Sequence, residues 1–531
     1  MSPFGRDANN CGAEVRPCQT IAQAVRQVTW GGVIYLNGSG SENLPFNCSL
    51  SGIHLNKSIS ITGFLSPKVN CIGGLYFQKA HNQPQIHVKL SEIIFWQTSL
   101  FFQDCQKITI VNCTFREATV AINVQLQNLT TFYLDISRDS LFHNNSLCID
   151  LLFLENVMSR ERQITVNIND VRFERNGFHV GPHRGIHRGG LRFTSKERSG
   201  TFLEQINVSC NNVKYVDSNG SFVDIYVANA STKEIYTNVE LASNDRTPYS
   251  LYFSNAKQLH VQFIRLQCLF NPSTRCIRIQ SNKAEVKIYD SSFYKIFQAL
   301  WFDSKINASL KIFNSSFIYN IARFGGSLLA TSRRGHMTIN ITNVIFRHCK
   351  ARYGCVMAIG KPSMGKGQRY KEESIPDELY FTLKKVTVEQ WYGKSSKCTA
   401  IHVLHKGGTV IIEDSRFNKK THTSVDGAVD VMTAGGKSNI TISNCSFVDK
   451  SITKRKGIAL KIASWNGNAG TVAVLNSLFI SSEKKQTAMF LNAKHHLKVI
   501  NSTMMSFRYG FKVFSSNTKN STFPIDIYVD K

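Results

Sequence analysis

Three aspartates share one place in a recurring phrase of this chain, and paired carboxylates are the groups that acid–base cleavage of a polysaccharide requires. They are Asp170, Asp290 and Asp414. Other copies of the phrase carry asparagine there, at Asn112, Asn314, Asn343, Asn444, Asn476 and Asn501. An amide cannot act as a general acid or base. The position is therefore predicted to cap a turn by local or inter-coil hydrogen bonds, and no catalytic residue is assigned.

Histidine gives a second candidate chemistry, because His183 and His187 are four residues apart and would share a metal ion on a helix. The segment 179–190 is rich in glycine and contains a proline, which disfavours a helix, and no carboxylate or thiol lies beside the two histidines. A solvated basic loop is the favoured interpretation. His495 and His496 are adjacent and would face opposite sides of a strand. No Cys-x-x-Cys pair occurs, so neither a metal nor another cofactor is predicted.

The phrase itself predicts the element that holds these residues. It reads apolar–x–apolar–x–Asn/Asp–x–x–Phe, and its clearest copies end at Phe115, Phe293, Phe317, Phe417 and Phe447. Weaker copies end at Phe95, Phe173, Phe346, Phe479 and Met504. A period of roughly 20 to 50 residues indicates an array of one supersecondary unit. Apolar residues alternate with period 2 and no long helical pattern intervenes, so the chain is predicted to be all-β, a single parallel β-helix with stacked internal phenylalanines.

The predicted domain boundaries follow the same pattern. Residues 1–32 form an N-terminal loop and a capping helix, since Thr20 and Gln23 have the spacing of a capping box and Ile21, Val25 and Val28 share one helical face. Residues 33–531 form the β-helix. Loop insertions are expected near 179–190, 232–250 and 361–376, and insertions on one face of such arrays often form the binding face.

Several segments resemble known β-helices. Cys18-Gln-Thr-Ile-Ala-Gln-Ala-Val25, Val33-Ile-Tyr-Leu36 and Lys57-Ser-Ile-Ser-Ile-Thr-Gly63 resemble the N-terminal coil of the pectin lyase-like superfamily, which implies a right-handed β-helix. Phe173-Glu-Arg-Asn176 before Gly189-Gly-Leu191, and Phe317-Ile-Tyr-Asn320 before Gly325-Gly-Ser-Leu328, resemble degenerate repeats of the polymorphic outer-membrane protein family of adhesins. The hydrolase patterns of the superfamily are not found. Arg278-Ile-Gln280 is the nearest fragment of one, and it lacks the expected lysine.

The compartment is predicted from glycosylation sequons and cysteines. Asn-x-Ser/Thr occurs at Asn37, Asn47, Asn56, Asn112, Asn128, Asn144, Asn207, Asn219, Asn229, Asn307, Asn314, Asn340, Asn439, Asn444, Asn501 and Asn520. These sequons favour a secreted eukaryotic glycoprotein, and the alternative is chance in an Asn/Ser/Thr-rich chain. The pairs Cys11/Cys18, Cys268/Cys276 and Cys349/Cys355 suit local disulfides in an oxidising compartment. Met1 is not followed by an apolar leader and no long apolar run is present, so we expect a fragment of a longer extracellular or cell-surface protein, without a membrane span of its own.

Charge suggests the partner. The formal net charge is +27, and basic residues concentrate in clusters near the C-terminus. Anionic glycan contacts are predicted at Lys384, Lys385, Lys419, Lys420, Lys454, Arg455 and Lys456. Such a stripe would attract sulfated or uronic-acid glycans or an anionic cell surface. The alternative is that the lysines only solubilise the face and prevent stray strand pairing. Nucleic acid is disfavoured because no nucleic-acid-binding motif is present.

These observations lead to an extracellular binding or structural protein of the adhesion or matrix type, with anionic glycans or cell-surface proteins as candidate partners. The alternative is a polysaccharide lyase or glycoside hydrolase with a divergent site, because acids far apart in sequence can meet on one face of a β-helix. Only 36 acidic residues are present, which disfavours the enzyme.

Overall fold

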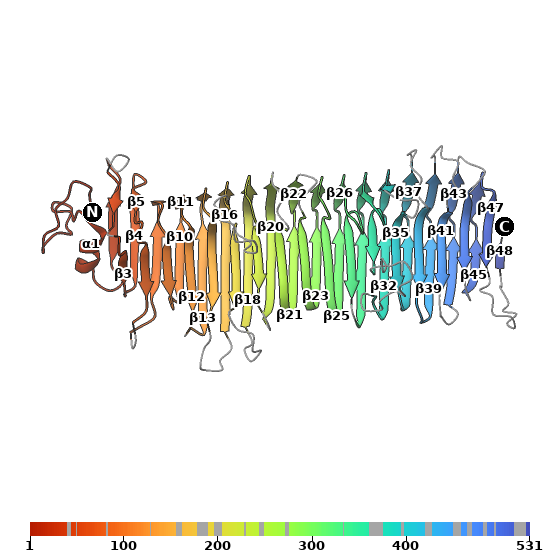
Figure 1. Cartoon of the computed structure of the whole chain (residues 1–531), viewed down its shortest axis with the longest axis horizontal. Coiled ribbons are helices and arrows are strands. Elements are labelled where there is room, and N and C mark those ends of the chain that lie inside the picture. Colours follow the sequence, from red (N-terminus) through yellow and green to blue (C-terminus); the bar gives the residue numbers. More distant parts are fainter. Residues whose placement is uncertain are drawn as a thin grey trace. The chain divides into compact units, whose positions relative to one another are not determined.

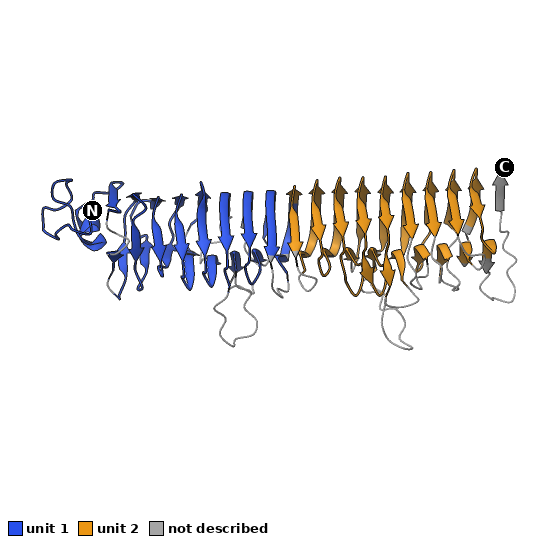
Figure 2. Ribbon diagram, turned by 90° about the horizontal axis from the view of Figure 1, so that it is seen from above, with its two compact units in different colours: residues 1–261 blue, residues 262–531 orange. Residues whose placement is uncertain are grey.

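Short parallel strands wind through three sheets, here named A, B and C, in each of two units of the chain. The computed structural model describes residues 1–39, 44–48, 50–80, 83–127, 129–154, 162–177, 189–195, 204–227, 230–243, 249–270, 275–332, 334–360, 375–393, 398–419, 427–449, 458–464, 470–481, 486–492, 495–514 and 527–530. Unit 1 comprises residues 1–261 and unit 2 residues 262–531 (Figure 2). Each unit is all-β and pairs its strands in parallel, so the predicted fold class is confirmed.

In unit 1 the strands follow one another in the order A, B, C (Figure 1). Sheet A holds β1 (Val33–Asn37), β4 (Ile59–Phe64), β7 (His87–Ser91), β10 (Lys107–Val111) and β13 (Thr131–Ser137). Sheet B holds β2 (Phe46–Asn47), β5 (Lys68–Asn70), β8 (Ile94–Trp96), β11 (Thr114–Arg116) and β14 (Ser140–His143). The long strands β16 (Arg162–Glu174), β18 (Glu204–Val216) and β20 (Ser231–Ser243) pass from A into B. Sheet C holds β3 (Ile53–Leu55), β6 (Leu75–Gln78), β9 (Leu100–Gln103), β12 (Val120–Leu126), β15 (Leu147–Phe153), β17 (Leu191–Ser195), β19 (Val223–Tyr226) and the start of β21 (Leu251–Ile264).

Unit 2 repeats this order. Sheet B holds β22 (Gln267–Phe270), β24 (Ser292–Tyr294), β26 (Ser316–Ile318), β29 (Ile345–Arg347), β33 (Thr387–Glu389), β37 (Arg416–Lys419), β40 (Ser446–Asp449), β43 (Leu478–Ser481) and β46 (Thr503–Met505). The strands β23 (Ile277–Tyr289) and β25 (Leu300–Phe313) pass from C into A. Sheet C continues with β27 (Leu328–Ser332), β31 (Met357–Ile359), β35 (Thr399–His405), β38 (Gly427–Thr433), β41 (Ile458–Ser464), β44 (Thr487–Asn492) and β47 (Tyr509–Phe514). Sheet A continues with β28 (His336–Thr342), β32 (Glu378–Lys384), β36 (Gly407–Glu413), β39 (Ser438–Ser443), β42 (Gly470–Leu475), β45 (His495–Ile500) and β48 (Ile527–Asp530). The two-residue strands β30 (Lys350–Ala351) and β34 (Tyr392–Gly393) pair separately.

Period-2 alternation directs apolar side chains into the interior of each coil. In β10, Ile108 and Ile110 are buried while Lys107 faces solvent. Residue-for-residue pairing with the next coil keeps equivalent side chains in register. The interior is therefore formed of stacked rows of like residues, which is how a strand array can grow without thickening its core.

The repeat phenylalanines form the predicted internal stacks. In unit 1, Phe95, Phe115, Phe142 and Phe173 stack with successive ring centroids 5.1, 4.8 and 4.9 Å apart. Unit 2 has two stacks, which comprise Phe293, Phe317 and Phe346, then Phe417, Phe447 and Phe479. Val388 pairs with both Phe346 and Phe417, so the smaller valine separates the two stacks.

The helix α1 (Ile21–Gln27) precedes the first strands, at the position that the capping box predicts. Thr20 Oγ1 accepts a hydrogen bond from Gln23 N at 3.2 Å. The reciprocal bond of a capping box is absent, because Thr20 N donates to Asp7 and the Gln23 amide donates to Ala8 O. Within the part of the chain that the structure describes, α1 is the one helix, and none is long and apolar enough to cross a membrane.

The expected insertion near 232–250 is wrong over residues 231–243, which form β20 and pair along β18. The prediction failed because two inward positions of β20 are polar, Thr232 and Glu234, so the apolar alternation is interrupted. Most of the expected insertions near 179–190 and 361–376 lies outside the described residues.

Candidate functional site

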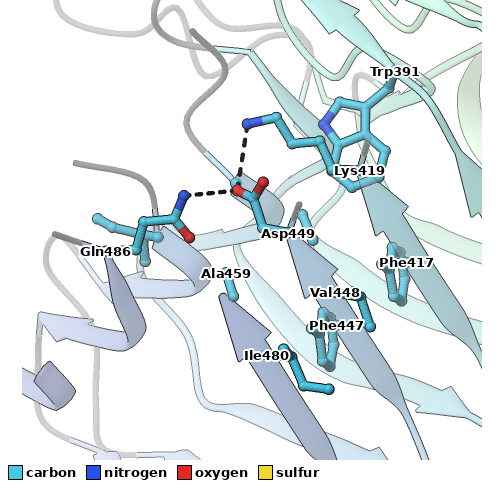
Figure 3. Close-up of a pocket in the computed structure, with 12 residues that line it drawn as sticks. Trp391, Phe417, Lys419, Phe447, Val448, Asp449, Ala459, Ile480 and Gln486 are labelled. Atoms are coloured by element: carbon cyan, nitrogen blue, oxygen red, sulfur yellow. Dashed lines mark hydrogen bonds and ion pairs between the residues drawn. The ribbon is translucent and has the colours of Figure 1, made fainter. Parts of the chain in front are cut away.

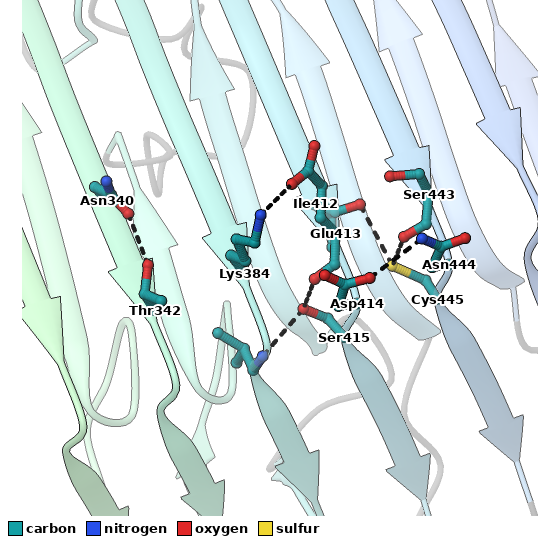
Figure 4. A network of polar contacts seen from close by, with 11 residues as sticks. Asn340, Thr342, Lys384, Ile412, Glu413, Asp414, Ser415, Ser443, Asn444 and Cys445 are labelled. Carbon is teal, nitrogen blue, oxygen red and sulfur yellow. Dashed lines mark hydrogen bonds and ion pairs between the residues drawn. The ribbon is translucent and has the colours of Figure 1, made fainter.

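The Asn/Asp column of the repeat lies at the turn from sheet A to sheet B. In unit 2, Asp290, Asn314, Asn343, Asp414 and Asn444 all have φ between 48° and 54°. This left-handed region is tolerated by Asn and Asp better than by other non-glycine residues. Figure 4 shows the contact between neighbouring coils, in which Asn444 Nδ2 donates to Asp414 Oδ1 at 3.2 Å. Asn343 donates to Asn314 in the same way at 2.8 Å. The column therefore holds the turn and links coils, and its aspartates are placed by conformation.

The residue after this column is also structural. Ser415 Oγ accepts from Val386 N at 3.1 Å and donates to Glu413 O at 2.7 Å, so it links two coils (Figure 4). Cys445 occupies the equivalent place in the next coil, where Sγ contacts Ser443 O. Burial raises the pKa of the Cys445 thiol to about 12. A thiol held neutral in this way is a poor nucleophile.

The Phe-x-x-Asn pattern behind the adhesin resemblance is likewise part of the scaffold. In unit 1, Asn145 and Asn176 are completely buried, and Asn145 Nδ2 donates to Asn176 Oδ1 at 3.2 Å. Asn176 Nδ2 also donates to Phe142 O at 2.9 Å. These amides satisfy backbone groups at the turn from sheet B to sheet C, which an apolar side chain could not do.

A second recurring phrase, which we did not use in predicting the site, marks the outward face of sheet C. It reads small–apolar–X–apolar, as in Ala400-Ile-His402-Val and Ala428-Val-Asp430-Val. The strand register aligns the X positions of successive coils in one row. In unit 1 the row contains Asn123, Asp150, Arg192, Asp224 and Tyr252. In unit 2 it contains Arg278, Trp301, Leu329, Ala358, His402, Asp430, Lys461, Phe490 and Lys512. The residues on either side of X are small or apolar in most coils, whereas X varies. The fold therefore does not dictate which side chain occupies X.

In unit 1 this row contains a bidentate ion pair. Arg192 Nε donates to Asp150 Oδ1 at 2.8 Å and Arg192 Nη2 donates to Oδ2 at 2.5 Å. The hydrogen bond that Arg192 donates to Asp150, together with the charges of Asp150 and Asp224, raises the pKa of Arg192. Asp150 is only 6% exposed. Both oxygens of this carboxylate are therefore engaged by the guanidinium.

In unit 2 the row brings together His402, Asp430 and Lys461, which lie 28 and 31 residues apart in sequence. His402 Nδ1 lies 3.3 Å from Asp430 Oδ2, and Lys461 Nζ lies 3.5 Å from the same oxygen. Burial acts to raise the pKa of Asp430, but the hydrogen bond and charge of His402 and the charge of Lys461 outweigh it, so the pKa is lowered. The other ring nitrogen of His402, Nε2, and the other carboxylate oxygen of Asp430, Oδ1, are each buried without a hydrogen-bond partner.

A group of basic residues, named here the basic column, lies at the turn from sheet C to sheet A in unit 2. It consists of Lys283, Lys305, Arg334, Lys406 and Lys437. Lys305 and Arg334 are direct neighbours, since Arg334 N donates to Lys305 O. Lys283 pairs with Asn307, two residues after Lys305. The described part of the coil between Arg334 and Lys406 contributes Asp377 to this turn and no cation. Five coil steps at about 4.8 Å each give the column a length of about 24 Å.

The basic column is largely uncompensated. Lys283, Lys305, Arg334 and Lys437 are exposed, and no ion pair joins them to a carboxylate among the residues that the structure describes. Lys406 is the exception, because its Nζ donates to Asp377 Oδ1 at 2.8 Å. That bond, with Arg334 nearby, lowers the pKa of Asp377. The column thus holds five cations against one ionised acid.

The basic residues that the sequence suggested do not form this column. Lys384 is exposed and pairs with Glu413 at 3.4 Å (Figure 4), and Lys385 is exposed at the left-handed turn position. Lys420, Lys454, Arg455 and Lys456 lie outside the described residues. The prediction for Lys419 is wrong, because its side chain is only 3% exposed.

Lys419 instead lines a small cavity in unit 2 together with Trp391, Phe417 and Phe447 (Figure 3). Its Nζ lies 3.5 Å from Asp449 Oδ2, which also accepts from Gln486 Nε2 at 3.0 Å. The alternation of β37 explains this placement, because Lys419 lies two residues after the inward Phe417 and so points to the same side. The space inside, about 20 Å³, suffices for one water molecule.

Four cysteine pairs lie at disulfide distance. Cys11–Cys18 and Cys268–Cys276 are two of the expected pairs. The Cys349/Cys355 pairing is wrong, because Cys355 joins Cys398. Cys355 N donates to Thr399 O of the next coil, whereas Cys349 is buried with its Sγ 3.1 Å from Ser327 Oγ. Cys48–Cys71, which we did not predict, also joins neighbouring coils.

The sequons lie on several faces of the two units. Asn37, Asn47, Asn56, Asn112, Asn307, Asn314, Asn439, Asn444 and Asn501 are exposed, and Asn144, Asn207, Asn219 and Asn340 are half-buried. Asn128, Asn229 and Asn520 lie outside the described residues. Asn307 lies in β25, which passes from sheet C into sheet A, and no other described sequon lies in a strand of sheet C.

The described ranges contain no cluster of three or more His, Cys, Asp or Glu side chains suited to hold a metal ion. The loop with His183 and His187 is not among them, and His496 is exposed. Comparison with known protein families, with curated proteins and with solved structures finds no match for this chain.

Proposed function

We propose that this chain is an extracellular β-helix that binds anionic glycans, and that the basic column of unit 2 is its contact surface. The observation that carries the proposal is that Lys283, Lys305, Arg334, Lys406 and Lys437 lie at the same turn in five of six successive coils. An extended polysaccharide with sulfate or carboxylate groups presents negative charge along a line, and the column presents positive charge along a line.

Long-range electrostatics favours this encounter. The net charge of +27 attracts any polyanion, while the column decides where the polyanion lies. Exposed pairs each contribute about 0.2–1 kcal/mol. Four such contacts, without Lys406, would contribute about 1–4 kcal/mol, enough to change affinity from about fourfold to several hundredfold.

A glycan is preferred over a nucleic acid because of the proposed compartment. Nine described sequon asparagines are exposed, as N-glycosylation requires of the finished protein, and four cysteine pairs suit an oxidising environment. The proposal includes membership of the pectin lyase-like superfamily with adhesin-like repeats, in a secreted eukaryotic glycoprotein that serves adhesion or matrix assembly. The parallel β-helix and the buried Phe-x-x-Asn amides support this assignment.

The decisive experiment compares two variants of equal charge. In the first, Lys283, Lys305, Arg334 and Lys437 become serine. In the second, Lys89, Arg116, Arg138 and Lys233 become serine; these residues are exposed on scattered elements of unit 1. Each variant removes four positive charges. A difference in elution between the two variants therefore reports the arrangement of the charges and not the net charge.

Retention on immobilised heparin, eluted with salt, is the measurement. The wild type is expected to elute at high salt, the scattered variant slightly earlier, and the column variant far earlier, because screening weakens exposed charges. Equal elution of the two variants would show that binding follows net charge alone and would exclude the column as a site. Elution of the wild type at low salt would exclude anionic glycan binding altogether. Equal competition by DNA would favour a general polyanion surface over a glycan site.

A further inference from the structure

A cavity of about 420 Å³ lies in unit 1 between α1 and the first strands of sheets B and C. Its volume falls within the range of small-molecule sites. Thr20 and Arg26 line it from the helical side, and Asn47, Gly52 and His54 line it from the strands. The cavity is thus bounded by polar side chains on both sides and by one aromatic ring.

One wall of this cavity is itself a sequon acceptor. Asn47 begins the sequence Asn47-Cys-Ser49 and its side chain is exposed at the end of β2. The backbone here is fixed, because the next residue, Cys48, is joined to Cys71 and its N donates to Asn70 O at 3.3 Å. A sugar attached to Asn47 would start from a rigid point on the cavity wall.

We propose that the N-linked glycan of Asn47 seats its first sugar in this cavity and thereby becomes part of the N-terminal cap of unit 1. This inference rests on the proposed secretory origin of the chain. The glycan needs no separate binding event, since covalent attachment to the wall supplies a high effective concentration.

The chemistry of the walls suits an N-acetylhexosamine. The His54 ring is stacked on Tyr76 with centroids 4.7 Å apart, which holds it as a rigid aromatic wall for the C–H face of a sugar. The exposed Arg26 guanidinium offers hydrogen-bond donors for sugar oxygens.

A buried acceptor without a hydrogen-bond partner lies beside Asn47 on the neighbouring strand, outside the residues that line the cavity. Asn70 pairs with Asn47 in the strand register, and its Oδ1 is buried without a hydrogen-bond partner. Buried acceptors are normally satisfied. The acetamido N–H or a hydroxyl of a sugar on Asn47 is a donor of the kind that this oxygen lacks.

We expect α1 and the strands beside it to be stabilised by contact with such a sugar. α1 has only seven residues, far fewer than an isolated helix requires for stability in water. It packs against β3, one of the first strands, and an uncovered edge strand is prone to unwanted pairing. A sugar that contacts both α1 and the strands would slow the opening of this end.

The test uses the full chain secreted from a eukaryotic host. Asn47→Gln and Ser49→Ala each remove the glycan by a different substitution, whereas Asn37→Gln and Asn56→Gln remove exposed sequons of unit 1 that do not line the cavity. Hydrogen exchange of the α1 backbone amides is the measurement. Both Asn47-site variants should exchange about tenfold faster in α1, as expected for the loss of about one hydrogen bond, and both controls should match the wild type.

A trimming experiment separates the first sugar from the rest of the glycan. An endoglycosidase that leaves one N-acetylglucosamine should preserve the slow exchange of α1. If peptide mapping shows glycans at other sequons but none at Asn47, or if the Asn47-site variants exchange like the controls, the inference is overturned while the extracellular proposal stands. If no sequon is glycosylated, both are overturned.

Discussion

Replacing Asp449 by asparagine should destabilise unit 2 more than replacing its partner Lys419 by methionine. The two residues form an ion pair beside the cavity of Figure 3. Lys419 is 3% exposed and Asp449 is 18% exposed, so the lysine depends far more on the protein for its solvation. Asparagine keeps the shape of Asp449 and its contact with Gln486, yet it removes the carboxylate that compensates the buried ammonium.

The magnitudes follow from the burial of each charge. Removing one partner of a buried pair costs about 3–5 kcal/mol because the remaining charge is left buried. Asp449→Asn is expected to lower the local free energy of unfolding by about 3 kcal/mol, at the lower end of this range. Lys419→Met should cost about 1–2 kcal/mol, because the partly exposed Asp449 keeps its hydrogen bond with Gln486. The double variant should cost about as much as Lys419→Met alone, since no buried charge then remains.

Hydrogen exchange of backbone amides in β37 and β40 measures these local free energies without assuming that the whole chain unfolds in one step. The double-mutant cycle should give a coupling of about 3 kcal/mol, because the cost of Asp449→Asn disappears when Lys419 is also replaced. Equal costs for the two single variants, or strict additivity in the double variant, would refute the argument from unequal burial. Asp377→Asn is a matched control, because it breaks the exposed pair with Lys406 and should cost under about 1 kcal/mol.

Four further outcomes are expected. Burial raises the pKa of Glu234 from 4.5 to about 8; the folded state then favours the protonated acid, so stability is complete below pH 4.5 and is lost as pH rises through 8, by at most about 5 kcal/mol. Glu234→Gln should therefore melt higher than the wild type at pH 9 and not at pH 4, and a parallel shift at both pH values would contradict this. Asn343→Ala should destabilise β28 and β29 by about 1–2 kcal/mol more than Asn343→Gly, measured by hydrogen exchange, because φ is 54° there; equal costs would remove the conformational explanation. In protein from a secretory host, Asn307→Gln should elute from heparin at higher salt than the wild type, because a glycan there would lie beside Lys305 in the basic column, while Asn112→Gln should not change elution. Incubation with pectin, alginate and glycosaminoglycans should release no unsaturated or reducing ends, and their appearance would establish the enzyme alternative.

Local periodicity carried most of the fold prediction. Each copy of the repeat predicts its own inward positions, its left-handed turn and its stacked phenylalanine. These three features depend only on residues within eight positions of one another in the sequence. The failures occurred where composition was given more weight than periodicity. Lys419 was assigned to the surface because lysine is rarely buried, although its spacing from Phe417 placed it inside. The insertion expected near 232–250 is instead strand over residues 232–243, where the inward Glu234 interrupts the apolar alternation.

The candidate site depended on alignment between coils. The spacing of the phenylalanines varies, with 24 residues from Phe293 to Phe317 and 29 from there to Phe346. A variable coil length means that turn residues of successive coils have no constant offset in sequence. The predicted basic clusters were therefore neighbours along the chain, whereas the residues of the basic column come from five different coils. The same reason explains why Cys355 pairs with Cys398, at a separation of 43 residues.

The amino-acid sequence by itself determined that this chain winds into a parallel β-helix, that its phenylalanines stack inside, and that its Asn/Asp positions hold turns. These are properties of single coils, repeated. The tertiary structure alone decided that Lys283, Lys305, Arg334, Lys406 and Lys437 share one turn, that His402 meets Asp430, and that Asn47 opens onto a cavity beside α1. Each of these depends on which residues of separate coils come into register, and hydrogen bonding between coils sets that register after chain segments of unequal length have been accommodated.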